Sequence, residues 1–264
     1  MAVVSLGYRT DLMLLELQGS VIERRAGYQV IRTSANPTFH WGNFLLLDRP
    51  PATGTVSSWM STFAREFPGA EHVALGVDDT GGGAGDEAEL ATAGLEADRS
   101  TVLTAATTTP PPRPNEVAQF RKLDSDADWE AALELQEAVY PYGEPEGWEG
   151  FNGIRLLAMR QMQAQGFGAW FGAFLDGRMV SGLGVFGDGS GVVRFQNVDT
   201  HPEHRNKGLA GTLVHKASRY AQQDLAAQTQ VIVADQTGTA IRIYRSVGFR
   251  DAETQVQLQR RQPG

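Results

Sequence analysis

The stretch from Val192 to Tyr220 limits the possible folds of this chain more than any other part. It opens with an apolar, strand-like run that ends at His201-Pro202, and a short basic loop follows. A helix pattern then begins, with one apolar stripe made of Leu209, Leu213, Val214, Ala217 and Tyr220. A strand therefore leads through a basic loop into a helix N-terminus. Strands, helices and hairpins alternate along the rest of the chain, which predicts a mixed α/β sheet.

The loop before this helix has the composition of an anion-binding site. The first turn of a helix has free backbone N–H groups and a partial positive charge. Gly208, Ala210 and Gly211 have little or no side chain, so a phosphate group can reach the backbone there. Arg205 and Lys207 add two full charges, and the guanidinium offers a planar fork of donors. An ordinary strand-to-helix turn can have the same composition, so the loop alone leaves the two interpretations equal.

Two motifs carry a resemblance to a known family. Arg205-x-x-Gly208-x-Ala210 resembles the Gln/Arg-x-x-Gly-x-Gly/Ala loop with which N-acetyltransferases of the GNAT superfamily hold the pyrophosphate of acyl-CoA. The run from Val198 to Pro202 resembles the splayed strand that precedes this loop, and Ala240 to Phe249 resembles the family's helix with its tyrosine and closing Gly-Phe. The resemblance covers about residues 117–259. It implies the GNAT-like acyltransferase fold, with acetyl-CoA as co-substrate.

The resemblance also implies contacts with acetyl-CoA. The pantetheine amides would pair with a free strand edge, and a backbone N–H near Val198 would stabilise the oxyanion. The residues on this edge are Val198, Asp199 and Thr200. The pyrophosphate would lie on Arg205, Asn206, Lys207, Gly208, Leu209, Ala210, Gly211 and Thr212. Thr237 stands where the family often has an asparagine, and its hydroxyl replaces only part of the hydrogen bonding of an amide.

Tyr244 occupies the position of the family's tyrosine, which implies that it protonates the departing CoA sulfur. A phenol with an ordinary pKa of about 10 keeps its proton at neutral pH and can give it to a nascent thiolate. The pattern alone favours a core tyrosine, because Tyr244 shares a stripe with Ala240, Ile241 and Val247. With the family position matched, the catalytic interpretation is preferred.

The acceptor side is less defined. The attacking amine must be neutral, and the candidates by position for the base that deprotonates it are Asp199, Gln196 and Glu149. The loop over 141–150 often faces the acceptor in this family, and three acids in it would attract a cationic amine: Glu144, Glu146 and Glu149. A solvated acidic loop is the alternative. The aromatic residues nearby either line the same cleft or anchor the loop; they are Tyr140, Tyr142 and Trp148.

Composition limits the partners. The net charge of −8 argues against a nucleic acid or an anionic membrane as a general partner. The chain has no cysteine, which excludes disulfides and a thiol nucleophile. No metal is expected, because the spacing of His201 and His204 is no metal signature. No apolar run is long enough to span a bilayer, and no leader pattern is present, so a cytoplasmic protein is expected.

A proline-rich segment from Thr107 to Asn115 divides the chain. We expect an N-terminal domain over 1–106, a linker over 107–116 and a catalytic domain over 117–264. Features of the second half recur in the first: Val73–Thr80 parallels Val231–Thr237, and each half has a hairpin with a glycine turn. We interpret the first half as a shortened, degenerate and inactive GNAT-like copy, with chance similarity as the alternative.

The residues favour an acetyl-CoA-dependent N-acetyltransferase that acts directly on a primary amine of a small molecule or peptide. The alternative is a non-catalytic acyl-CoA-binding regulatory module with the same fold. Three loop residues and one helix residue favour the enzyme: Arg205, Gly208, Ala210 and Tyr244. An unrelated nucleotide-binding domain would need a phosphate loop with Lys-Ser/Thr or a dinucleotide fingerprint, and the sequence contains neither. A monomer and a homodimer are equally compatible with the sequence.

Overall fold

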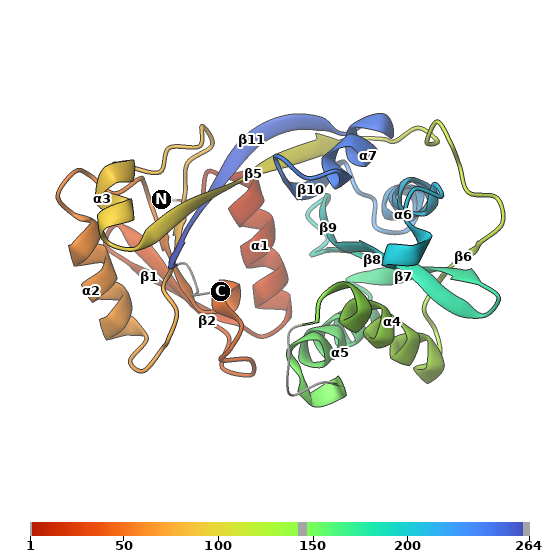
Figure 1. Cartoon of the computed structure of the whole chain (residues 1–264), viewed down its shortest axis with the longest axis horizontal. Coiled ribbons are helices and arrows are strands. Elements are labelled where there is room, and N and C mark those ends of the chain that lie inside the picture. Colours follow the sequence, from red (N-terminus) through yellow and green to blue (C-terminus); the bar gives the residue numbers. More distant parts are fainter. Residues whose placement is uncertain (1, 142–146, 261–264) are drawn as a thin grey trace. The chain divides into compact units, whose positions relative to one another are not determined.

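The computed structural model describes residues 2–141 and 147–260, which form two compact units. Unit 1 comprises the residues up to Val102 together with those from Ala252 onward. Unit 2 runs from Leu103 to Asp251, so the proline-rich segment lies inside it (Figure 1). The three-part division expected from the sequence stays a prediction. Among the described residues, the helices are all too short or too polar to cross a membrane.

Unit 1 is built on a sheet with the strand order β1-β2-β3-β4-β11. Its strands pair antiparallel except for β3 and β4, which are parallel. The hairpin with a glycine turn that was expected in this half joins β1 to β2 through Ala26-Gly27. The elements are α1 (Leu6–Leu17), β1 (Val21–Arg25), β2 (Tyr28–Arg32), η1 (His40–Gly42), β3 (Phe44–Leu47), α2 (Val56–Glu66), β4 (Ala74–Val77), α3 (Glu87–Thr92), β5 (Leu95–Ala105) and β11 (Arg250–Arg260).

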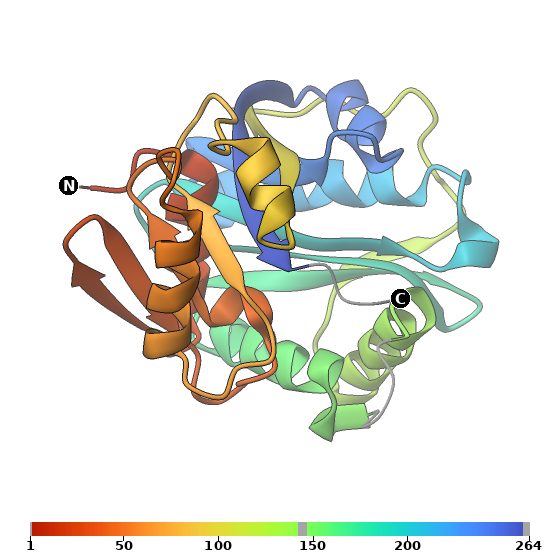
Figure 2. The ribbon, with the colours of Figure 1, turned by 60° about the vertical axis from the view of Figure 1, so that its left-hand side comes forward.

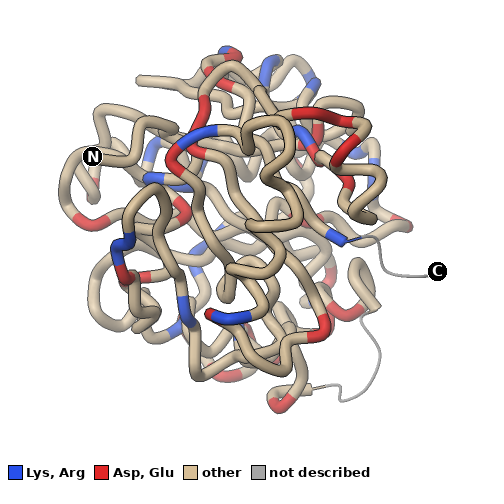
Figure 3. Tube along the Cα trace, turned by 90° about the vertical axis from the view of Figure 1, so that its left-hand side faces the viewer, with Lys and Arg blue, Asp and Glu red and all other residues tan. Residues whose placement is uncertain are grey.

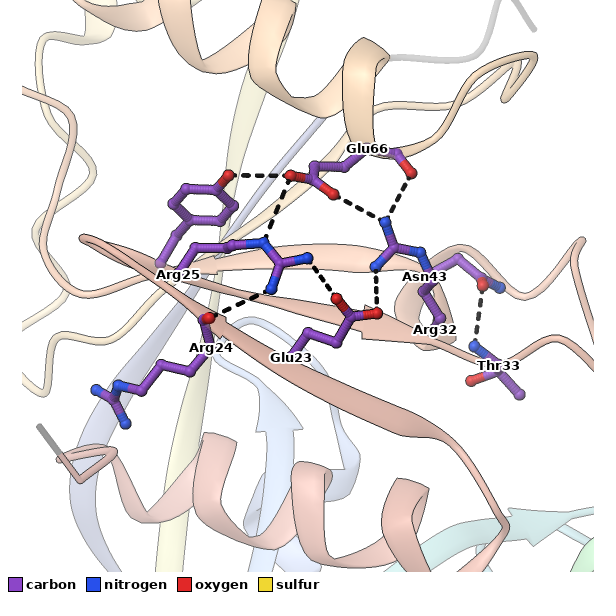
Figure 4. A network of polar contacts seen from close by, with 8 residues as sticks. Glu23, Arg24, Arg25, Arg32, Thr33, Asn43 and Glu66 are labelled. Carbon is purple, nitrogen blue, oxygen red and sulfur yellow. Dashed lines mark hydrogen bonds and ion pairs between the residues drawn. The ribbon is translucent and has the colours of Figure 1, made fainter.

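A network of hydrogen bonds and ion pairs joins the β1–β2 hairpin to the end of α2 (Figure 4). Glu66 accepts a hydrogen bond from Arg32 Nη2 at 2.8 Å and another from the Tyr28 hydroxyl at 3.0 Å. Glu23 of β1 pairs with Arg25 and Arg32 on the same side of the hairpin. The Arg32 hydrogen bond lowers the pKa of Glu66. All of these contacts lie within unit 1, and their role is to stabilise the packing of the hairpin against α2.

Unit 2 has the strand order β10-β9-β8-β7-β6. Neighbouring strands pair antiparallel from β6 to β9, and β9 pairs with β10 in parallel. Helices α4 and α5 cover one face of this sheet, and α6 and α7 cover the other (Figures 1 and 2). The elements are β6 (Gln119–Lys122), α4 (Asp126–Val139), η2 (Gly147–Glu149), α5 (Phe151–Ala164), β7 (Gly168–Leu175), β8 (Arg178–Gly187), β9 (Val192–Thr200), η3 (Pro202–His204), α6 (Leu209–Asp224), β10 (Thr229–Asp235) and α7 (Ala240–Ser246).

The two units repeat one order of elements. In unit 1, β1-β2-β3 is followed by α2, β4, α3 and β5; in unit 2, β7-β8-β9 is followed by α6, β10, α7 and β11. Residues 256–259 of β11 pair with β4 within unit 1, and Leu103 and Ala105 of β5 lie in the apolar core of unit 2. The order of elements in the first half therefore repeats the order in the second.

Charged residues of both signs are interspersed along the chain (Figure 3). The net charge of −8 therefore does not come from one long acidic segment. A local concentration of positive charge can exist in such a molecule, and the loop before α6 is the place where the sequence predicts one.

Candidate functional site

Strand β9 separates from β10 partway along its length. The two strands pair at three positions only, the last of which joins Arg194 to Val231. Beyond this point the β10-facing edge of β9 has no strand partner among the described residues. Val198, Asp199 and Thr200 lie on this stretch. Backbone groups on an unpaired edge can bind an extended ligand.

A β-bulge lies in the same part of β9. Asp199 pairs with Gly182 of β8 and Gln196 pairs with Gly184, so two residues of β9 oppose one of β8. One of the two, Asn197, has a φ of +46°. Its Oδ1 accepts a hydrogen bond from Arg155 Nη2 at 3.1 Å, which holds the bulge from α5. Because a bulge interrupts the ladder, it can direct a backbone N–H near Val198 toward a ligand.

The N-terminus of α6 is uncapped. Gly208 is its N-cap residue, and no side chain makes a capping hydrogen bond there. Within the described part of the chain, the N–H groups of residues 206–211 have no acceptor, and Thr212 is the first whose N–H is bonded, to Gly208 O at 3.2 Å. Free N–H groups at a helix start form a site for a phosphate or a carboxylate.

The proline-rich segment packs against this helix start. Asn115 donates its N–H to Thr212 Oγ1 at 2.9 Å and its side-chain amide to Lys207 O at 2.8 Å. A Cβ at position 208 would lie 2.3 Å from the carbonyl oxygen of Arg113, and Gly208 has a φ of +74°. Only glycine therefore fits at this position. Sequence analysis missed this contact, because a proline-rich run gives no periodic signal for its packing partner.

The residues predicted to bind the pyrophosphate differ in the hydrogen-bond donors that they leave free for a ligand. Arg205 donates from Nε to Thr200 O at 3.3 Å, and its terminal nitrogens make no hydrogen bond to a described residue. The Thr212 hydroxyl is engaged within the protein, because it donates to Gly208 O at 2.9 Å and accepts from Asn115. Thr212 therefore shapes the turn, and the free donors are the backbone N–H groups and the two basic side chains.

A cavity of about 550 Å³ adjoins the same loop. Its lining residues are Val117, Leu175, Asp176, Arg178, Val180, His204 and Lys207. His201, Glu203 and His204 place potential metal-ligand atoms within 4.8 Å of one another. Arg178 Nη2 lies 3.1 Å from His201 Nε2, and desolvation together with Lys207 lowers the pKa of His204. These neighbouring cations favour an anion over a metal ion at this position.

Tyr244 of α7 is only 5% exposed and lies in the apolar core of unit 2. Burial raises the pKa of its hydroxyl well above the ordinary value, and the charges of Asp199 and Tyr140 raise it further. Tyr244 therefore keeps its proton throughout the neutral range. The core position is compatible with a proton-donating role, because the hydroxyl stays protonated at neutral pH.

Asp199 is 2% exposed. Burial raises the pKa of its carboxyl to about 6, although Tyr140 and Arg155 favour the ionised form. Gln136 and Tyr140 lie near it, but neither carboxylate oxygen accepts a hydrogen bond of good geometry from the described residues. Sequence analysis assigned the backbone of Asp199 to the cofactor and named its side chain only as one of three candidate bases.

The remaining predicted residues lie at the borders of this region. Thr237 donates its N–H and its hydroxyl to Asp235 Oδ1, at 2.8 and 2.9 Å, and so shapes the turn between β10 and α7. Trp148 anchors its loop, because its Nε1 donates to Glu130 Oε1 at 2.7 Å. Glu149 is exposed in η2. Tyr142, Glu144 and Glu146 lie outside the described residues.

The corresponding helix start in unit 1 already has an anion. Glu89 of α3 accepts the N–H of Val56 at 2.8 Å and that of Gly54 at 2.7 Å, which caps α2. This carboxylate occupies the place that a phosphate takes at a free helix N-terminus. Sequence analysis interpreted this half as an inactive copy, but it did not identify Glu89.

One protein-family model matches the part of the chain that contains β9, the loop before α6 and α7. The model described as "Acetyltransferase (GNAT) family" matches residues 129–249. This segment is a GNAT family domain. It includes β9, the loop before α6, and Tyr244. No curated protein sequence matches the chain.

Solved structures extend the likeness in fold beyond the GNAT domain. A GCN5-related N-acetyltransferase from Kribbella flavida is 17% identical, with 98% of this chain and 97% of that chain covered, at a TM-score of 0.65. One from Sphaerobacter thermophilus is 14% identical, with 97% and 92% covered, at a TM-score of 0.58. A tandem GNAT protein from the clavulanic acid biosynthesis pathway is 14% identical, with 96% and 93% covered, at a TM-score of 0.55. The expected GNAT fold is confirmed over nearly the whole chain.

Proposed function

We propose that the GNAT domain transfers an acetyl group from acetyl-CoA to a primary amine of a small molecule or peptide. The observation that supports this most is the coincidence of three features in β9 and its continuation. The strand leaves β10, bulges at Asn197, and leads through Arg205 into an uncapped helix. Together they offer an extended edge, an oxyanion donor and a phosphate site along one short segment.

Acetyl-CoA would bind along this segment, with its pyrophosphate at the helix start and its pantetheine at the free strand edge. The free N–H groups of residues 206–211 would hold the pyrophosphate, with Arg205 and Lys207 supplying positive charge. The free edge at Val198 to Thr200 would pair with the amides of pantetheine. The two hydrogen bonds of Asn115, which we call the Asn115 brace, would keep the helix start in position. They join Asn115 to Thr212 and to Lys207.

The chemistry would be direct transfer. The amine nitrogen attacks the thioester carbonyl, and a backbone N–H near Val198 stabilises the oxyanion that forms. The carbon–sulfur bond then breaks, and Tyr244 gives its proton to the sulfur. Its raised pKa does not prevent this, because the same buried surroundings also raise the pKa of a thiol formed there.

A thiol-release assay with acetyl-CoA and a panel of primary amines tests this proposal. Time-dependent release of CoA thiol with at least one amine, together with formation of the N-acetyl product, supports the enzyme. Binding of acetyl-CoA in calorimetry without release on any amine favours the non-catalytic acyl-CoA-binding module. The absence of both binding and release would remove both interpretations.

A further inference from the structure

The cavity beside the loop before α6 lies on the side of β9 that faces away from its free edge. The strand order places β8, β7 and β6 on one side of β9, and β10 on the other (Figure 1). The free edge at Val198 to Thr200 faces β10, whereas the strands that line the cavity lie on the β8 side. The lining residues from these strands and their ends are Val117, Leu175, Asp176, Arg178 and Val180.

Two residues of the loop before α6, His204 and Lys207, complete the lining. The start of this loop is held next to β8, because His201 donates its N–H to Val180 O at 2.9 Å. Its end is held by the Asn115 brace, which includes the 2.8 Å hydrogen bond to Lys207 O. His204 and Lys207 therefore line the cavity from a backbone that is fixed at both ends.

The two cationic side chains of the lining have no acidic partner. Among the described residues, neither Arg178 nor Lys207 forms an ion pair with a carboxylate. Asp176 is the one lining residue with a carboxylate, and it is exposed in the β7–β8 turn. The lining thus has two positive charges against one negative charge. Two unpaired cations at one cavity favour an anionic ligand.

Arg178 presents a guanidinium that is held from one end. Its Nη2 donates to His201 Nε2 at 3.1 Å, since an arginine can only donate. The other N–H groups of the guanidinium have no hydrogen-bond partner among the described residues. A planar fork of free donors is suited to two parallel hydrogen bonds with a phosphate or a carboxylate.

His204 adds a further donor. Its Nδ1 is shielded from solvent and has no hydrogen-bond partner in the described part of the chain. Desolvation lowers the pKa of its imidazole, and the neighbouring basic groups lower it further, against an opposite effect of Glu203. The ring is therefore neutral at neutral pH and can donate one N–H. A buried polar atom without a partner is costly, and an oxygen of an anionic ligand would satisfy it.

The size and the apolar wall of the cavity indicate an organic ligand. A volume of about 550 Å³ lies in the range of sites for small organic molecules and exceeds the need of an inorganic anion. Val117, Leu175 and Val180 form an apolar wall beside the basic groups. A phosphate monoester has three acceptor oxygens and nearly two negative charges, which match the arginine fork, the lysine and the imidazole N–H better than a carboxylate does.

We propose that this cavity is a second anion site, which binds the phosphate monoester of a small organic molecule other than acetyl-CoA through Arg178, Lys207 and His204. The inference goes beyond the proposed acyl transfer and does not depend on it. The two sites meet at Lys207, whose side chain lines the cavity and whose backbone belongs to the loop before α6. Because two bound anions share this charge, each lowers the affinity for the other. Only this last expectation rests on the proposed function.

Phenyl phosphate is the probe, because it joins a phosphate monoester to an apolar ring, and phenol is the uncharged control. Calorimetric titration of the full chain at neutral pH should give one saturable site with a Kd below about 1 mM. Arg178→Gln should weaken this binding at least about tenfold, as expected for lost hydrogen bonds to a charged group. Arg205→Gln is the matched control, since Arg205 does not line the cavity, and it should change the Kd by less than about twofold.

Three outcomes of these titrations overturn the inference. The first is that phenyl phosphate does not saturate the protein in the millimolar range. The second is that phenol binds as tightly as phenyl phosphate. The third is a loss of affinity in Arg205→Gln with none in Arg178→Gln, which would place the phosphate at the start of α6.

A crystal structure of the wild type with phenyl phosphate needs no variant and so does not depend on the folding of one. A phosphate group within hydrogen-bond distance of Arg178 and His204 supports the inference. A phosphate group on the N–H groups of residues 206–211 alone overturns it.

Titration with acetyl-CoA in the presence of phenyl phosphate separates the two sites. The Kd of acetyl-CoA should rise with phenyl phosphate and reach a plateau, as expected for two sites that share a charge. A rise without a plateau means that both ligands compete for one site, which overturns the inference. If acetyl-CoA does not bind at all, the proposed function fails, and the phenyl phosphate titrations still decide the inference.

Discussion

The N–H of Asn115 donates to the hydroxyl of Thr212 at 2.9 Å, although the two residues are 97 positions apart in sequence. The same hydroxyl donates to the carbonyl of Gly208, the N-cap residue of α6. The proline-rich segment is therefore connected by hydrogen bonds to the proposed phosphate loop at the start of α6. Changes in the segment are expected to reach the loop through this bond.

Gly208→Ala is expected to weaken acetyl-CoA binding at least tenfold and to destabilise the protein. The new Cβ would lie 2.3 Å from Arg113 O, and the left-handed backbone adds about 1–2 kcal/mol of strain for a residue with a Cβ. Calorimetric titration with acetyl-CoA and chemical denaturation measure the two effects. Gly189→Ala is the control, because Gly189 has a φ of +85° but no atom within 4 Å of the added Cβ. Equal effects of the two substitutions on acetyl-CoA affinity would contradict a role for the close contact between Gly208 and Arg113 in shaping the phosphate loop.

Tyr244→Phe should lower turnover at least tenfold and leave acetyl-CoA affinity near the wild-type value. The ring stays in the core of unit 2, and only the hydroxyl that would protonate the sulfur is removed. Steady-state thiol release and calorimetry check this. Tyr220→Phe serves as the control, since Tyr220 lies on α6 against Phe171 and its ring contact does not need the hydroxyl. Unchanged turnover in Tyr244→Phe would remove the proposed role.

Sequence predicted the elements around the site well, because their signals are local. The apolar run of β9 ends just before His201-Pro202, and α6 begins directly after Gly208, as the residues predict. The strands β5 and β11 run past the exposed charged residues Glu96 and Asp251, which interrupt their apolar pattern.

Contacts between distant residues could not be read from the sequence. The brace from Asn115 to α6 and the cap from Glu89 to α2 each join residues with no common periodicity. The burial of Asp199 was equally hidden, since an aspartate near the end of a strand is more often solvated. Its orientation follows from the bulge at Asn197, which shifts the register of β9 and has no sequence signal of its own.

Asp199→Asn is expected to stabilise the protein at neutral pH. Burial raises the pKa of Asp199 from 3.8 to about 6, so between these values the native state binds more protons than the unfolded state. The contribution of Asp199 to the free energy of unfolding therefore falls as pH rises through this range, by at most about 3 kcal/mol at about 1.4 kcal/mol per pH unit. Chemical denaturation should show the variant more stable than the wild type at pH 7.5, with the difference shrinking toward pH 4. A difference that does not depend on pH would contradict the burial of an ionised carboxyl.

Glu89→Gln should destabilise unit 1 without changing acetyl-CoA affinity. The Glu89 carboxylate accepts two backbone N–H groups at the start of α2, and a neutral amide loses the charge that favours this position. We expect a loss of about 0.5–2 kcal/mol in the free energy of unfolding, typical of the loss of a helix N-cap. Glu87→Gln is the control on the same helix, because the Glu87 side chain is 70% exposed and, among the described residues, pairs with Arg99 at the surface. If Glu89→Gln left stability unchanged and instead created a second acetyl-CoA site, unit 1 would be a suppressed binding site and not a degenerate copy. Calorimetry distinguishes these results, since the number of acetyl-CoA molecules bound per chain stays at one in the first case and rises to two in the second.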